Sequence, residues 1–62
     1  MKNEFKVGDR VRVGMGAMDF RGEKGTIQKI GSNMLGWTLI DVLLDDHKRV
    51  NCFYPTELGK LD

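Results

Sequence analysis

The chain has 62 residues and a formal net charge of +1, from ten lysines and arginines against nine aspartates and glutamates. A chain of this size buries only about 60% of the surface it exposes when unfolded, so we expect a single domain over residues 1–62, with no second core. Cys52 is the only cysteine, which excludes a disulfide within the chain. With one cysteine and one histidine, His47, a structural zinc site with four ligands is disfavoured, and no metal or cofactor is expected.

The first strand is expected over residues 10–13, whose valines share one face while the arginines share the other. A loop over residues 14–19 follows it, and Phe20 is expected to close this loop against the core. Here and along the rest of the chain, short apolar runs alternate with polar residues between turn signals. This pattern predicts an all-β fold.

A glycine-rich corner comes next. Residues 21–25 are expected to turn the chain, with Gly22 and Gly25 as bends, because glycine adopts positive φ at little cost. The second strand is expected over residues 26–30, and residues 31–33 are expected to form another turn.

The longest apolar run, residues 37–44, predicts a central strand buried on much of both faces. Residues 45–48 are rich in aspartate and predict a hairpin turn. The fourth strand is expected over residues 49–54, and Pro55 to Leu58 predict a short 3-10 turn because proline sets φ. Leu61 is expected to close a short last strand.

Five short strands in so few residues cannot bury enough apolar surface as an open sheet with one wet face. Bent and closed on itself, the same sheet makes a five-stranded barrel and removes most exposed edges. With its strands and glycines placed in this way, the chain resembles an SH3-like barrel.

Residues 7–30 resemble a KOW motif, which occurs in ribosomal large-subunit proteins and NusG-type transcription factors. The matching positions are Gly8-Asp9, Val11, Val13 and Gly16 in the first half, and Gly22, Gly25, Ile27 and Ile30 in the second. Arg21 stands where the motif has lysine, and the loop is about two residues longer. The resemblance implies the barrel fold and leaves the function open.

The chain also resembles the plasmid-borne type II dihydrofolate reductases. The shared features are Gly8-Asp9-Arg10-Val11-Arg12, the pair Gly16-Ala17 and the pair Tyr54-Pro55. In that family a lysine after the arginine and a V-Q-I-Y segment line the pore of a homotetramer, where folate and a nicotinamide cofactor stack. Here Val13 takes the lysine position and residues 51–54 read Asn-Cys-Phe-Tyr. The polar recognition of both ligands is therefore lost, and this activity is disfavoured.

Other candidates for chemistry favour structural interpretations. Asp45, Asp46 and His47 form a solvated hairpin tip whose side chains diverge, so a turn is favoured over a metal or acid–base cluster. Cys52 lacks a neighbouring base in the sequence, and a small buried or half-buried strand residue is favoured over a nucleophile. No catalytic residue is assigned.

A group of basic side chains could form one ridge able to contact phosphates of a nucleic acid. They are Arg10, Arg12, Arg21, Lys24 and Lys29. The alternative is a solvated strand face with local pairing to Asp9, Asp19 or Glu23, which the interspersed acids favour.

The aromatic residues are numerous for a small barrel, and three of Phe20, Trp37, Phe53 and Tyr54 are expected in or near the core. Trp37 after Gly36 and Tyr54 before Pro55 could instead lie at the rim and bind a partner. Met15 and Met18 could cover the barrel end, which is favoured, or form an adaptable contact patch. A protein-binding surface would comprise Met15, Met18, Trp37 and Tyr54.

The favoured function is a non-catalytic binding module, an adaptor or regulator that acts through protein contacts. Nucleic-acid binding by the KOW-like half is the alternative, and a tetrameric reductase is a disfavoured third. We expect a complete small bacterial or phage accessory protein, monomeric or weakly self-associating. The lone thiol fits a reducing cytoplasm, and no apolar run approaches the ~18 residues of a spanning helix, so no membrane partner is expected.

Overall fold

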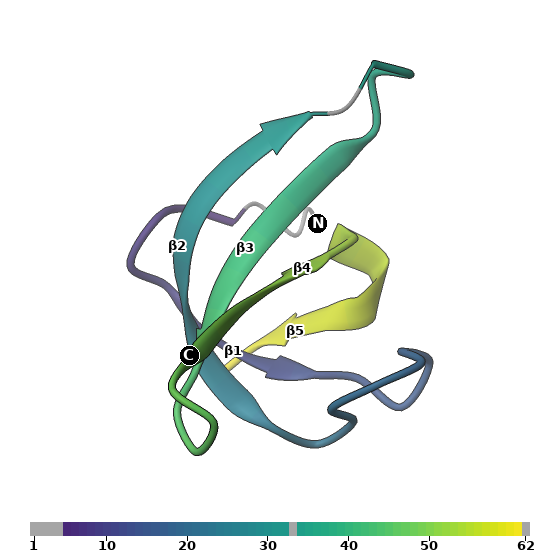
Figure 1. Ribbon diagram of the computed structural model, residues 1–62. Coiled ribbons are helices and arrows are strands. Elements are labelled where there is room, and N and C mark those ends of the chain that lie inside the picture. Colours follow the sequence, from purple (N-terminus) through teal and green to yellow (C-terminus); the bar gives the residue numbers. More distant parts are fainter. Residues whose placement is uncertain (1–4, 33, 62) are drawn as a thin grey trace.

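The computed structural model describes residues 5–32 and 34–61. Within them lies one five-stranded antiparallel sheet in the order β4-β3-β2-β1-β5 (Figure 1). Its elements are β1 (Arg10–Val13), β2 (Lys24–Ser32), β3 (Thr38–Leu44), β4 (Arg49–Phe53), the 3-10 helix η1 (Pro55–Glu57) and β5 (Leu58–Lys60). The all-β prediction with five strands and a 3-10 turn after Tyr54 is confirmed. The curved sheet is compatible with a small β-barrel fold (Figure 1).

The strands bury alternate residues, as a pleated strand with one face on the core should. In β1 the two valines are buried and Arg12 is exposed. In β2 the register with β3 shifts between Ile27 and Lys29. This bulge leaves both Gln28 and Lys29 exposed and returns Ile30 to the side of the core, opposite Ile40. The prediction that β3 is buried on both faces is only partly right, because its outer residues are half-buried or exposed.

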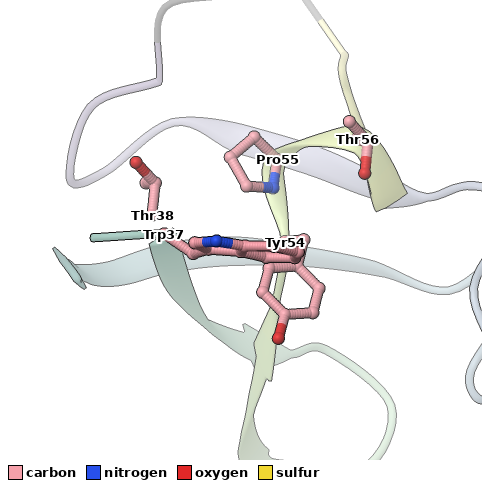
Figure 2. A pocket seen from close by; sticks show the side chains of 5 residues that line it. All are labelled: Trp37, Thr38, Tyr54, Pro55 and Thr56. Carbon is pink, nitrogen blue, oxygen red and sulfur yellow. The ribbon is translucent and has the colours of Figure 1, made fainter. Parts of the chain in front are cut away.

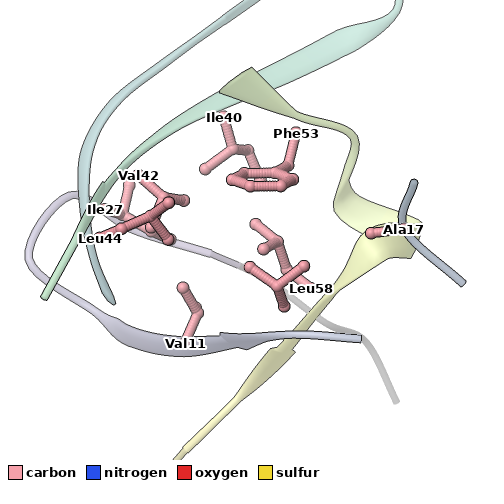
Figure 3. Close-up of a cluster of buried hydrophobic side chains, with 9 residues drawn as sticks. Val11, Ala17, Ile27, Ile40, Val42, Leu44, Phe53 and Leu58 are labelled. Atoms are coloured by element: carbon pink, nitrogen blue, oxygen red, sulfur yellow. The ribbon is translucent and has the colours of Figure 1, made fainter. Parts of the chain in front are cut away.

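The core is a single apolar cluster contributed by every strand and by the first loop (Figure 3). Phe20 packs against this cluster as expected, although it is only partly buried. The fully or nearly buried members are Val11, Val13, Ala17, Ile27, Ile40, Val42, Leu44, Phe53 and Leu58.

The two glycines of the expected corner have different roles. Gly22 has φ +84° and turns the chain before β2, as predicted. Gly25 does not lie in the turn. It is buried within β2, opposite Val11 and Leu44, and a Cβ there would lie 2.5 Å from the carbonyl oxygen of Leu43. Gly25 therefore allows two strands to approach closely and is not a bend.

Other boundaries shift by a few residues. Residues 31 and 32 continue β2 as a long strand rather than forming the expected turn, and Asn33 lies outside the described residues. The predicted last strand begins at Leu58, before Leu61, whose N–H still donates to the carbonyl of Arg10 (3.0 Å). The hairpin turn over residues 45–48 is confirmed.

Candidate protein-binding surface

Trp37 and Tyr54 are held next to each other by two local structures. Gly36 has φ +83° and directs Trp37 into the start of β3. Tyr54 leaves β4 and is fixed by η1, since its N–H donates to Oε1 of Glu57 and its carbonyl accepts the N–H of Glu57, both at 2.9 Å. Both aromatic positions are thus set by backbone geometry beside them.

The two rings meet edge to face, with centroids 5.5 Å apart and planes inclined by 66°. They line an open apolar groove of about 370 Å³, together with Thr38, Pro55 and Thr56. Figure 2 shows Pro55 on one side of the indole plane and the phenol of Tyr54 on the other, with its hydroxyl pointing away. None of the described side chains that line this groove carries a charge at neutral pH. We call it the aromatic groove.

Two further exposed apolar side chains precede Trp37 in the chain, in the connection between β2 and β3. Met34 is 102% exposed and Leu35 is 79% exposed, at a tip that projects beyond the rest of the sheet (Figure 1). We call Met34 and Leu35 the hairpin tip, and the tip and groove together the apolar rim. The sequence carried a signal for this surface, because residues 30–40 contain no charged side chain.

The aromatic residues divide differently from the prediction. Phe53 is buried and Phe20 is partly buried, but Trp37 (57%) and Tyr54 (38%) are both exposed. Two of the four, rather than three, therefore serve the core. The other two lie at the rim, which was the alternative placement.

Met15 and Met18 are not packed over the barrel end, so the favoured placement is wrong. Both are exposed, and Ala17 between them is the residue of this loop that enters the core. Neither methionine lines the aromatic groove. Met18 instead lines a separate cleft of about 120 Å³ beside Phe20 and Cys52.

The five basic residues do not form one ridge of equivalent charges. Arg10 donates to the two carboxylate oxygens of Asp45 from its terminal guanidinium nitrogens Nη1 and Nη2 (2.9 and 2.6 Å), and Nη1 also donates to Oγ1 of Thr26 (2.8 Å). This bond from Arg10 holds the pKa of Asp45 below its ordinary value. Arg10 therefore serves the fold, tying β1 to the β3–β4 turn.

The other four basic side chains are exposed. Arg12 and Lys24 lie directly opposite each other on β1 and β2, so the structure brings these two together. Lys29 lies farther along β2 opposite Asp41, and Arg21 lies in the turn before β2.

The acidic partners also differ from those expected. Asp9 pairs with Lys60 (3.4 Å). A hydrogen bond from the backbone N–H of Lys6, together with the charge of Lys60, lowers the pKa of Asp9. Glu23 lies 3.6 Å from His47, whose ring meets Phe20 edge to face at 5.1 Å. The first loop is thereby fastened to the β3–β4 turn.

Cys52 was expected to be buried or half-buried, and this is wrong. It lies on the outer face of β4, opposite Asp41, while its neighbour Phe53 faces the core. Partial desolvation, followed by the nearby charge of Asp41, raises the pKa of the Cys52 thiol. A thiol held in its protonated form is a poor nucleophile.

Among residues 5–32 and 34–61, no three His, Cys, Asp or Glu side chains gather closely enough to hold a metal ion. Over the same residues, no helix has the length and apolar character needed to cross a bilayer. Comparison of the chain with protein-family models, with curated proteins and with solved structures found no match.

Proposed function

We propose that this protein is a non-catalytic binding module that acts through protein contacts, with the apolar rim as its binding surface. We assign it to the SH3-like barrels, with a KOW-like first half, and to the accessory proteins of a bacterial or phage cytoplasm. The strand order β4-β3-β2-β1-β5 and the 3-10 turn between β4 and β5 support the fold part of this assignment.

The observation that carries the proposal is the aromatic groove with its exposed, uncharged surroundings. The centres of protein interfaces are depleted in charged residues and enriched in tryptophan, tyrosine and methionine. Trp37, Tyr54 and Met34 are of these types and are exposed. The rings of Trp37 and Tyr54 are in contact, and Met34 lies three residues before Trp37 in the β2–β3 connection. An uncharged, extended apolar segment of a partner protein fits such a groove, with its side chains against the indole and Pro55.

The groove is also firmly supported, which lowers the cost of ordering it on binding. Glu57 fixes both backbone polar groups of Tyr54, and its own carbonyl accepts the N–H of Gly14 (2.7 Å). The first loop, η1 and the groove are consequently linked by short backbone hydrogen bonds.

A reductase of the type II kind remains disfavoured. The position that holds a pore lysine in that family is Val13, which is 1% exposed and belongs to the core. A side chain in the core of its own subunit does not reach a pore ligand. Of the other pore segment, only Tyr54 is retained, and it lines the groove.

Nucleic-acid binding is the second candidate, and one observation favours it. Arg12 and Lys24 are exposed and directly opposite each other, an arrangement that costs stability unless an anion lies between them. If these two cations bind phosphates, affinity for a mixed-sequence oligonucleotide should fall steeply with salt, and Arg12→Ala should reduce the slope. Binding absent at 50 mM salt would dismiss this candidate.

The main proposal is tested by capture from a lysate of the source cell with the tagged chain. We expect a partner that the wild type retains and Trp37→Ala loses. Val7→Ala is the matched control, because Val7 is an exposed apolar residue (64%) in the turn before β1, outside the rim. A partner captured equally by wild type and Trp37→Ala would refute the assignment of this surface.

A further inference from the structure

We infer that the apolar rim is a self-association surface, on which the hairpin tip of one copy of this chain occupies the aromatic groove of a second copy. The inference rests on the proposed function in that it uses the same surface, and it names the occupant. It requires no other kind of protein.

The first observation is that one end of the molecule carries both a projection and a recess. Met34 and Leu35 project from the hairpin, and the groove between Trp37 and Pro55 begins two residues later. A two-fold contact requires this arrangement, because whatever a copy inserts it must also receive. Trp37 belongs to the hairpin and also lines the groove, so tip and groove are close enough to take part in one contact.

The second observation is the distribution of charge. In a two-fold contact the same patch meets itself, so any net charge on the patch faces a copy of itself and opposes association. Charged residues make up 31% of the chain, yet residues 30–40 contain none, and none of the described residues that line the groove is charged. Along the hairpin the flanking charges are Lys29 and Asp41, which are opposite in sign and lie directly across from each other in the sheet. Beside the groove, the carboxylate of Glu57 is turned back to accept the N–H of Tyr54. The hairpin can therefore face its own copy without bringing a net charge into the contact.

The third observation sets the expected strength. A standard interface covers about 800 Å² on each partner, which would be nearly a fifth of the 4439 Å² of surface that this small molecule exposes. A contact made by two tip side chains and a short groove falls below that standard size and belongs with the weak, transient interfaces. We therefore expect a weak association that is sensitive to concentration.

The contact between two copies covers the same groove that the proposed partner would bind. A partner that binds the aromatic groove must displace the tip of the second copy. Dilution, which separates the copies, should then increase the fraction of chains able to bind that partner.

The test is sedimentation equilibrium of the purified chain alone, from about 10 μM to 1 mM. We expect the wild type to change from monomer to dimer across this range. Leu35→Lys and Met34→Glu should each stay monomeric, because they bring like charges into the contact. Val7→Lys is the matched control and should dimerise as the wild type does, since Val7 is similarly exposed but lies outside the rim.

Tryptophan fluorescence locates the contact, because Trp37 is the only tryptophan of the chain. Its emission should shift to shorter wavelength as the concentration rises, and acrylamide should quench it less in the dimer. A wild type that remains monomeric at 1 mM overturns the inference. A dimer that survives in both folded variants, or that leaves the Trp37 emission unchanged, overturns it as well.

The two proposals fail separately. Self-association is measured without any other protein, so a strictly monomeric chain that still captures a Trp37-dependent partner removes this inference and leaves the proposed function. A dimer that shifts the Trp37 emission and is lost in the Leu35→Lys and Met34→Glu variants, with no captured partner, supports this inference and removes the adaptor role.

Discussion

Gly25→Ala is the sharpest test of the close approach between β2 and β3. A Cβ at this position would lie 2.5 Å from the carbonyl oxygen of Leu43 and 2.6 Å from Cγ1 of Val42. Cβ atoms essentially never approach other heavy atoms to less than 3.0 Å. The valine methyl group can rotate away, but the backbone oxygen cannot move unless β3 moves with it.

The expected cost follows from this difference. An added methyl group in a packed interior usually costs about 1–3 kcal/mol, and an obstruction by backbone places Gly25→Ala at the upper end of that range. At about 0.05–0.15 kcal/mol per residue, a chain of this length has roughly 3–9 kcal/mol of stability in total. The substitution should therefore remove a third or more of the free energy of unfolding.

Urea denaturation followed by circular dichroism measures the effect, and Gly31→Ala is the matched control. Gly31 lies in the same strand, its φ is not positive, and a Cβ there meets no atom within 4 Å. We expect the control to be neutral or slightly stabilising, because alanine restricts the unfolded chain. A Gly25→Ala midpoint close to that of Gly31→Ala would refute the close-approach account of Gly25.

Three further predictions concern strain, pH and the thiol. Lys48→Gly should stabilise the protein by up to about 1 kcal/mol, because Lys48 has φ +52°, which only glycine adopts freely; an unchanged or lower urea midpoint would contradict this. Arg10→Gln should lower the free energy of unfolding at pH 7, and this loss relative to the wild type should shrink as the pH falls below 3.8, the ordinary pKa of Asp45. The bond from Arg10 lowers the pKa of Asp45 in the folded state, so the ion pair stabilises the fold above the unfolded-state pKa and ceases to do so once Asp45 is protonated. An equal loss at pH 7 and pH 2.5 would argue against the pair. Asp41→Asn should speed alkylation of Cys52 by iodoacetamide at pH 8, since the carboxylate raises the thiol pKa, and an unchanged rate would exclude that influence.

The local parts of the fold were predictable because they depend on short-range patterns. Alternation in residues 10–13 gave the buried face of β1, and Pro55 gave the 3-10 turn. Gly25 was misassigned because its neighbour is the carbonyl of Leu43, which β3 brings alongside only when the sheet forms. The partner of Arg10 was missed for the same reason, since Asp45 lies 35 residues away.

Strand β4 shows a different limit. Val50 and Cys52 share one face and Phe53 takes the other, so apolar residues lie on both sides of the strand. Alternation alone does not decide which face is inward. The larger aromatic ring removes more apolar area from water, and Phe53 takes the core position while Cys52 faces outward.

The candidate surface was half predictable. Gly36 and Pro55 marked Trp37 and Tyr54 as rim residues, and the structure brings the two rings together through the pairing of β3 with β4. Met34 and Leu35 were missed because the interpretation relied on aromatic residues and on the long first loop. The absence of charge over residues 30–40 was the signal available for them.

The composition of the hairpin tip is not explained by the stability of the fold. An apolar side chain stabilises a protein by leaving water, and Met34 at 102% exposure gains nothing in this way. Hairpin connections usually consist of polar residues, which keep the chain soluble at no cost to the core. In a sequence where nearly a third of the residues are charged, a tip with the exposed side chains Met34 and Leu35 is the kind of apolar surface that marks interaction sites. Both proposals supply a contact that would remove these side chains from water, which is why the rim, rather than the basic residues or Cys52, carries them.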